Sequence, residues 1–427
     1  MNFSDELNHQ AAFRTLRALC ERFSSRVSGS VQELETMRYL VQQFRKKVGF
    51  YPVVDQYPVK YYKGHYASIQ ILPDGDIIEG RPIWMTVNTP SEGVIEDIQV
   101  VYLDGEEIVS SDNYSHRIVV VKSSKDYLDP EIFIQLKEIY KLNPSAVVIL
   151  SSYHDEVVRT DTIFKEFSIF SEIPTMIVPE TKFPLGEIEK KKGKMLIFGE
   201  IERGNMFNVS LIIPGAEKEF ILVYANHDTV DNTQGARENA AGLAILLEVA
   251  KEISKHNLYY SYRFISLGGK EIGLEGMRKI LEDYDPSKVC FGINIDSIGS
   301  NPEKIIAAVS GDEKIQSIVD SISSSTEIPL EFISGTPDGK SNHIMTEKNI
   351  PSVTVMIEGN EPKNIIRTEL DSIDEYNPIS LKIAGEYVLN LIKKIEQMKD
   401  IHLSKNIPLK LRNDSVKYLE ILRLFQE

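Results

Sequence analysis

Cysteine is almost missing from the sequence, because the 427 residues include only Cys20 and Cys290. Two cysteines cannot supply a Cys-rich zinc motif, so that class of metal site is excluded. Cys20 lies in an amphipathic helix pattern, and Cys290 lies in an apolar strand pattern. We expect both to be reduced thiols in the protein core.

Long apolar runs and a basic excess are missing as well. No apolar run approaches the ~18 residues that a membrane-spanning helix requires. The N-terminus, MNFSDELNHQAAFRTL, has no charged region followed by an apolar run, so we expect no signal peptide. A net charge of −15 argues against nucleic-acid and anionic-membrane partners. We therefore expect a cytoplasmic protein, and a peptide, a protein or a second copy of the chain remains open as a partner.

The strongest pattern in the sequence lies between residues 220 and 300. Three short apolar runs each end in a polar cluster, and these clusters are Asn226-His227-Asp228, Lys270-Glu271 and Asp296. Helical patterns separate the runs, which predicts parallel strands with helical crossovers. Ligands of such sheets bind beyond the carboxyl ends of the strands, so the chemistry is expected at these clusters.

The remaining sequence indicates two domains. Residues 1–60 and 201–427 have alternating helix and strand patterns, and residues 400–427 are expected to form a terminal helix. Residues 61–200 are dominated by short strand patterns with turn signals, which predicts an inserted, mainly β domain. His154 and Asp155 are isolated within this insertion and are expected on a surface loop.

Several motifs together resemble one known family. The segments YANHDT, GARENAAG, GGKEIGLEGM, NIDSIG, KSNHIMTEKNIPSVTV and IIRTELDSIDEYNP follow one another in this order. In this order and spacing they resemble the di-zinc aminopeptidases, whose relatives include leucyl aminopeptidase, glutamate carboxypeptidase, glutaminyl cyclase and the transferrin receptor ectodomain. The resemblance implies a three-layer α/β/α zinc-exopeptidase-like domain with a mostly parallel sheet. It also implies that residues 61–200 form a protease-associated-like domain.

The resemblance also implies a particular chemistry. Family members hold two zinc ions with two histidines and three carboxylates, and a glutamate next to one ligand accepts a proton from the metal-bound water. In this chain Asn226 and Arg367 occupy the histidine positions, and Lys270 occupies the position of the base. The carboxylate positions are retained as Glu238, Glu271 and Asp296.

These replacements suggest a different balance of charge. Three unpaired carboxylates in a half-buried pocket would be unstable, because burial removes their hydration. A guanidinium has no lone pair for a metal, and an ammonium accepts no proton unless its pKa is strongly depressed. We hypothesise that Lys270 and Arg367 form salt bridges where the family has metals. No metal or other cofactor is then predicted.

Three functions remain open at this point. The first is a non-catalytic aminopeptidase-like protein that binds a peptide or partner, just as the transferrin receptor ectodomain has the fold without the peptidase chemistry. The second is a hydrolase with an altered, single-metal centre, in which zinc would be the cofactor. The third uses Lys270 as a nucleophile, which neighbouring carboxylates disfavour because they raise the pKa of a lysine.

The second function requires nearby side chains to take over lost roles. Glu238, Glu271 and Asp296 would be the metal ligands that remain. The candidates to join them are His227, His343, Asp228 and Glu275. A one-residue bulge would be needed to turn His227 inward. His343 matches a family histidine that is not normally a ligand, and Asp228 or Glu275 would act as the base.

Overall fold

The structure is a computed structural model that describes residues 6–103, 114–125, 130–151, 171–188, 191–322, 326–360, 365–374, 376–398 and 405–424. The chain divides into two compact units, Met1–Val59 with Gly204–Glu420 and Lys60–Arg203 with Ile421–Glu427. Residues 154 and 155, expected on a surface loop, lie outside the described residues. None of the described helices is both long and apolar enough to cross a membrane.

The first unit is built on a mostly parallel sheet. Its strands are β7 (Lys192–Ile213), β8 (Phe220–Asn226), β9 (Ser261–Leu267), β10 (Val289–Ile298), β11 (Pro302–Ser310), β12 (Leu330–Ser334) and β13 (Ser352–Gly359). They lie in the order β7-β9-β8-β10-β13-β11-β12. Strands β9, β8, β10 and β13 are parallel neighbours, whereas β7 is antiparallel to β9 and β11 is antiparallel to β13. The predicted α/β class is confirmed.

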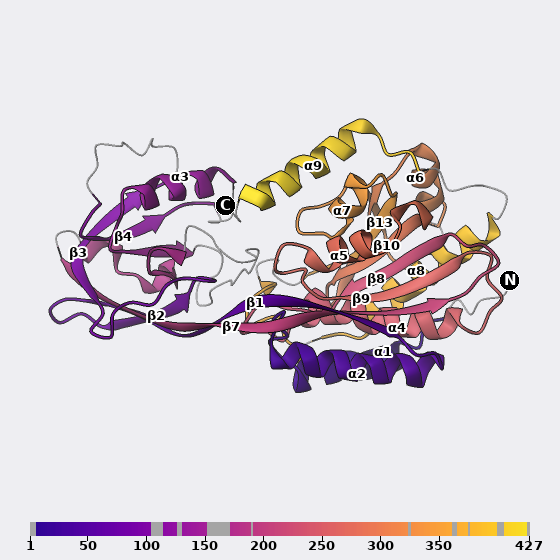
Figure 1. Cartoon of the computed structure of the whole chain (residues 1–427), viewed down its shortest axis with the longest axis horizontal. Coiled ribbons are helices and arrows are strands. Elements are labelled where there is room, and N and C mark those ends of the chain that lie inside the picture. Colours follow the sequence, from indigo (N-terminus) through magenta and orange to yellow (C-terminus); the bar gives the residue numbers. More distant parts are fainter. Residues whose placement is uncertain are drawn as a thin grey trace. The chain divides into compact units, whose positions relative to one another are not determined.

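Helices cover both faces of this sheet. Figure 1 shows α1, α2 and α4 below the strands, and α5 and α7 above them. The helices are α1 (His9–Arg22), α2 (Val31–Val48), α4 (Ala241–Ile253), α5 (Glu275–Asp283), α6 (Glu313–Asp320), α7 (Asn342–Glu347), α8 (Ile379–Gln397) and α9 (Leu409–Leu424). Helix α4 is the most deeply buried, because residues 241–250 all lie in the core. Both cysteines are buried free thiols, as predicted.

Local sequence explains where helix α2 begins and ends. The Ser30 hydroxyl accepts a hydrogen bond from the Glu33 backbone N–H at 3.2 Å, which satisfies one unpaired donor of the first turn. Gly49 ends the helix with a φ of 84°, a left-handed conformation that glycine adopts readily. Helix α2 brings Glu33 close to strand β8.

A close approach between α4 and β10 positions the segment that precedes α4. A Cβ atom on Gly242 would lie 2.2 Å from the Ile295 carbonyl oxygen, so only glycine fits at this point of the helix. A single π-type turn, Ala236–Ala240, leads into α4. This contact places Glu238, in that turn, beside Asp296 near the end of β10.

The second unit is a strand-rich domain. Its elements are β2 (Ile77–Pro82), β3 (Val94–Tyr102), β4 (Arg117–Lys122), α3 (Pro130–Lys141), β5 (Ala146–Ser151) and β6 (Thr175–Pro179), together with parts of β1 (Val53–Ile71) and β7. The strand order is β1-β2-β6-β5-β4-β3-β7, and β1 also pairs with β7. Its core includes Ile118, Val120, Val148, Met176 and Val178. Short 3-10 turns lie at Glu180–Lys182 and Leu185–Glu187, and a third, at Pro286–Lys288, lies in the first unit.

Helix α9 packs on the segment that leads into α7. The Tyr418 ring stacks on the His343 imidazole with centroids 4.1 Å apart. The Tyr418 hydroxyl accepts a hydrogen bond from the Gly339 backbone N–H at 2.7 Å. These contacts fix the segment that carries Lys340. The terminal helix expected over residues 400–427 is described over residues 409–424.

Candidate functional site

A buried charged cluster lies at the carboxyl edge of the central parallel strands. Asn226 is the last residue of β8, Lys270 and Glu271 follow β9, and Asp296 lies near the end of β10. Glu238 enters from the turn before α4. The structure thus brings together polar residues that are up to 70 positions apart in these three strands, as their motif spacing predicted.

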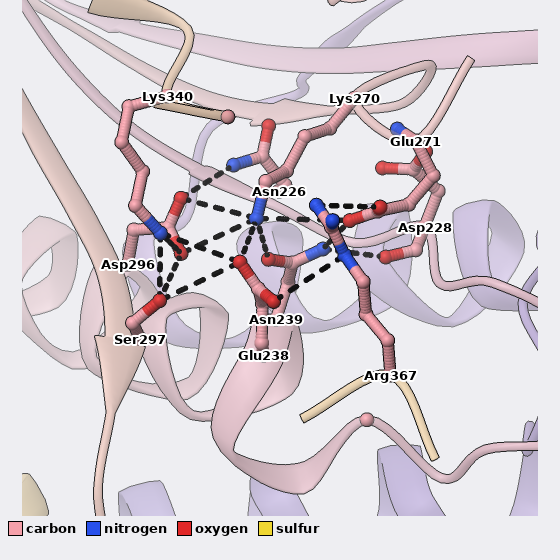
Figure 2. A network of polar contacts seen from close by, with 12 residues as sticks. Asn226, Asp228, Glu238, Asn239, Lys270, Glu271, Asp296, Ser297, Lys340 and Arg367 are labelled. Atoms are coloured by element: carbon pink, nitrogen blue, oxygen red, sulfur yellow. Dashed lines mark hydrogen bonds and ion pairs between the residues drawn. The ribbon is translucent and has the colours of Figure 1, made fainter. Parts of the chain in front are cut away.

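Lys270 lies at the centre of the cluster, with a side chain that is fully buried. Figure 2 shows its ammonium directed at Glu238, Asn239 and Asp296. Its Nζ atom donates to Asn239 Oδ1 at 2.7 Å and lies 3.3 Å from Asp296 Oδ2. It also pairs with Glu238 and lies 3.6 Å from Glu271 Oε1. One ammonium therefore contacts all three retained carboxylates.

Two further cations approach the same carboxylates from opposite sides in Figure 2. The Arg367 guanidinium lies 3.1 Å from Glu271 Oε2 and 3.7 Å from Glu238 Oε2. Lys340 Nζ lies 3.0 Å from Asp296 Oδ1 and 3.3 Å from Glu238 Oε1. We call Lys270, Lys340, Arg367, Glu238, Glu271 and Asp296 the ion-pair cluster.

Lys340 was not among the site residues predicted from the sequence. An imbalance of charge could have indicated it, because the predicted site held three carboxylates but only two cations. Lys340 stands in the quoted segment KSNHIM, directly before Ser341, and thus within a motif already assigned to the site. With this third cation, the formal charges of the ion-pair cluster balance.

The side chains of the ion-pair cluster remain charged. Burial alone would raise the pKa of Glu238, but Lys270, Lys340 and Arg367 outweigh burial and hold that pKa well below its usual range. The pKa of Asp296 is lowered for the same reason, by Lys270 and Lys340 against burial. Burial would lower the pKa of Lys270, yet Asp296, Glu238 and Glu271 raise it. Lys270 is therefore a poor proton acceptor and a poor nucleophile at neutral pH.

Neutral side chains complete the contacts around the ions. The Asn226 amide donates to Asp296 Oδ2 at 3.5 Å. The Asn239 amide donates to the Asp228 carbonyl at 2.7 Å and to Glu271 Oε1 at 3.3 Å. Lys340 Nζ donates to the Ser297 hydroxyl oxygen at 2.7 Å. Asn226 thus stabilises a carboxylate from a position where the family resemblance implies a histidine ligand.

Two buried aspartates hold the backbone of the site. Asp371 accepts hydrogen bonds from the backbone N–H groups of Arg237 and Glu238, at 2.8 Å and 3.1 Å. Asp228 Oδ2 accepts from the Glu271 N–H at 2.9 Å and from the Ser28 hydroxyl at 3.0 Å. Burial raises the pKa of each carboxyl group to about 6. Asp228 therefore positions Glu271 through its backbone, which is a different task from that of a general base.

His227 points away from the ion-pair cluster. Its Nδ1 lies 2.8 Å from the Ser266 hydroxyl, and its Nε2 lies 3.2 Å from Glu33 Oε1. Burial lowers the pKa of His227 to about 4 and raises that of Glu33 to about 8. Both groups are consequently neutral near pH 7, so the contact is a hydrogen bond between a carboxylic acid and an imidazole. Glu33 was not among the residues predicted from the sequence.

We expect the replacement Glu33→Gln to change how stability depends on pH. The folded pKa of Glu33 is raised above the ordinary value of 4.5, so the folded state binds more protons than the unfolded state between about pH 4.5 and 8. Stability from this group is therefore full at low pH and declines by up to about 1.4 kcal/mol per pH unit across that window. Urea unfolding of both proteins at pH 5 and pH 9 measures this effect.

Compared with the native protein, Glu33→Gln should be destabilised more at pH 5 than at pH 9. The replacement Glu35→Gln is a matched control, because Glu35 lies on the same helix with a side chain that is 46% exposed. A pH-independent difference between the native protein and Glu33→Gln would contradict a protonated Glu33.

The other candidates for a metal centre are also engaged elsewhere. His343 Nδ1 lies 3.1 Å from the Ser415 hydroxyl, and its Nε2 lies 3.1 Å from the Pro337 carbonyl oxygen. The Glu275 carboxylate pairs with Arg278 at 3.4 Å within α5. The single-metal alternative requires His227 or His343 to face the carboxylates. In the structure, neither side chain does so.

The residues of the ion-pair cluster do not fit a two-zinc centre. Zinc prefers thiolate, imidazole and carboxylate ligands, and an ammonium or guanidinium cannot serve. The carboxylate oxygens of Glu238, Glu271 and Asp296 already face cationic nitrogens, so zinc ions would have to enter among three positive charges. Across the described ranges, no group of three or more His, Cys, Asp or Glu side chains is arranged to hold a metal ion.

An apolar cavity opens beside the cluster. Its volume is about 240 Å³, and its aliphatic walls come from Ile306, Met356, Ile357, Ile365 and Ile366. Drug-sized ligands occupy pockets of roughly 300–1,000 Å³, so this cavity suits a single side chain. Ser297 lines it and also contacts Lys340, which connects the cavity to the charged groups.

Comparisons with known proteins agree with this fold. Residues 208–392 match the model of Peptidase family M28. Aminopeptidase YwaD of Bacillus subtilis (strain 168) is 26% identical over 199 residues, which cover 43% of this chain and 43% of that protein. The match therefore spans less than half the length of that relative.

Solved structures are similar over almost the whole chain. BSAP, a zinc aminopeptidase from Bacillus subtilis, has a TM-score of 0.76 and 16% identity, with 95% of this chain and 99% of that chain covered. A Peptidase M28 precursor from Shewanella amazonensis SB2B has a TM-score of 0.77 and 16% identity, with 93% and 95% covered. Likeness at this identity shows the fold. The sequence matches are confined to part of this fold, residues 208–392 for the family model.

Proposed function

We propose that this chain is a non-catalytic aminopeptidase-like protein that binds a peptide or the terminus of a partner protein. The observation that carries the proposal is the position of Lys270. Its buried ammonium contacts Glu238, Asn239 and Asp296 where the family resemblance implies a general base and metal ions. An ammonium with a raised pKa does not accept a proton from water.

The cavity beside the cluster supports a binding role. A concave apolar site flanked by a few polar groups is the usual form of a ligand pocket. Here aliphatic side chains such as Ile306 and Met356 would accept an apolar side chain, and Ser297 with the ion-pair cluster would meet the polar backbone of the peptide. The strand-rich unit, Lys60–Arg203, would correspond to the protease-associated-like domain.

Metal content and peptidase turnover test this proposal together. The purified protein is expected to contain zinc well below one equivalent by elemental mass spectrometry. It should not hydrolyse a panel of aminoacyl-p-nitroanilides, with or without added zinc, cobalt or manganese, because no group of the cluster can activate water.

The alternative is an active hydrolase with an altered centre, and the same assay recognises it. Metal-dependent turnover that disappears in Glu271→Ala, but persists in the control Glu282→Ala, would replace the proposal with this alternative. Glu282 is a suitable control because its side chain is 48% exposed and pairs with Lys279 across a turn of α5.

A further inference from the structure

Charged side chains border the apolar cavity, and Arg237 among them pairs with Asp371 at 3.5 Å. Arg237 and Ser297 line it together with the aliphatic residues, and Ser297 accepts a hydrogen bond from Lys340. Glu358 is the acidic residue of the lining, and Lys304 lies 3.4 Å from its carboxylate. A ligand whose side chain fills the cavity would therefore have its polar end beside cations.

Within the ion-pair cluster, the cations are the more accessible groups. The side chains of Arg367 and Lys340 are 14% and 9% exposed. The carboxylates lie deeper, because Glu238, Glu271 and Asp296 are 6%, 3% and 0% exposed. A polar group that enters along Ser297 meets the Lys340 ammonium there, and the Ser297 hydroxyl also donates to Asp296 Oδ1 at 3.1 Å.

We propose that this site binds the carboxyl-terminal residue of a peptide, with the apolar side chain in the cavity and the terminal carboxylate against Arg367 and Lys340. The proposal rests on the proposed function, because it assumes that the ion pairs stand where family members would hold metals. A guanidinium carries five N–H donors and an ammonium three, so each can serve more than one carboxylate. Charge-assisted hydrogen bonds of this kind are among the stronger polar contacts.

The opposite orientation, with a peptide amino terminus at the cluster, is disfavoured by the same geometry. A terminal ammonium needs carboxylates as partners. Each carboxylate of the cluster already faces a cation of the chain itself, at 3.1 Å for Glu271 and 3.0 Å for Asp296. An incoming ammonium would displace a tethered cation and would be repelled by the other two.

Three dipeptide probes distinguish these orientations: N-acetyl-Ala-Leu, N-acetyl-Ala-Leu-amide and Ala-Leu-amide. Calorimetry on the full chain, with a chelator present, is expected to show at least a tenfold higher affinity for the free carboxylate than for either amide. Equal affinities for acid and amide, tighter binding of the free amine, or no binding of any probe would overturn the proposal.

Two variants assign the preference to the site. Arg367→Gln should reduce the acid-to-amide affinity ratio at least fivefold. Ile306→Trp, which fills the cavity, should abolish binding of all three probes. Because this replacement does not alter the ion-pair cluster, it tests the site even if Arg367→Gln proves unstable. Arg17→Gln is the charge-matched control, because Arg17 is 57% exposed on α1, and it should bind as the native chain does. An unchanged ratio in a folded Arg367→Gln protein would contradict the assignment.

Failure of this inference is separable from failure of the proposed function. Peptide cleavage during incubation with zinc, detected by mass spectrometry, would contradict the non-catalytic assignment. An inert, zinc-free protein without a preference for the free carboxylate would contradict only the orientation proposed for the peptide.

Discussion

Replacement of Lys270 by alanine is expected to lower the free energy of unfolding by about 3–5 kcal/mol. The reason is the loss of the central cation. Glu238, Glu271 and Asp296 would remain buried with only Lys340 and Arg367 as partners, so three carboxylates would share two cations. A buried carboxylate that loses its partner keeps its full desolvation penalty.

Urea unfolding at pH 7.5, followed by circular dichroism, measures this loss. Lys279→Ala serves as the control, because Lys279 pairs with Glu282 on the protein surface, and exposed pairs contribute about 0–1 kcal/mol. If Lys270→Ala were no more destabilising than Lys279→Ala, the three carboxylates would not depend on the central ammonium.

The decrease in the free energy of unfolding caused by Lys270→Ala should become smaller as the pH falls. The pKa values of Glu238 and Asp296 are lowered by the neighbouring cations, which outweigh burial, so these pairs stabilise the fold above the ordinary carboxyl pKa of about 4. That stability disappears as the pH drops through the lowered folded values. In Lys270→Ala the carboxylates can take up protons at higher pH, so the difference in stability between the two proteins should narrow from pH 7 to pH 4 and narrow further below pH 4.

The sheet and the meeting of its strand ends could be predicted from periodicity and spacing. Apolar runs ending at Asn226, before Lys270 and at Asp296 are short and separated by helical patterns, which is sufficient to predict parallel strands with a common carboxyl edge. The resemblance to the di-zinc aminopeptidases then implied Glu238 and Arg367 as site residues, and the structure places both in the ion-pair cluster. Apolar periodicity and the spacing of strands and helices are regular along the sequence, so they can be recognised before the structure is known.

The contacts that escaped prediction depend on tertiary packing. Lys340 joins the cluster from a segment that α9 holds through Tyr418, and nothing in the local sequence around Lys340 shows that contact. Glu33 meets His227 across 194 positions, from a helix pattern where a glutamate is usually exposed. The direction of the His227 side chain follows from strand alternation, but its protonation state follows from complete burial.

A variant that restores the charges of a metal centre is expected to gain zinc binding. The replacements are Asn226→His, Lys270→Glu, Lys340→Ser and Arg367→His, and they return two histidines and a glutamate to positions where the family resemblance implies them. Lys270→Glu lowers the formal charge of the cluster by two units, and the changes at Lys340 and Arg367 lower it by one unit each. The total equals the charge of two divalent cations, so zinc would take over the neutralisation that the three cations now provide.

Calorimetric titration with zinc is expected to show an affinity at least ~100-fold higher than that of the native chain, which is about 2.7 kcal/mol of binding free energy. The matched control keeps Lys340 and carries the other three changes. It should bind zinc weakly, because Lys340 Nζ would still lie about 3 Å from Asp296 and Glu238, the carboxylates that zinc requires. Equal affinity in the control and the fourfold variant would show that Lys340 does not compete with a metal. Tight stoichiometric zinc in the native chain would show that the ion-pair cluster and metal ions are not alternatives, because the carboxylates would then serve both.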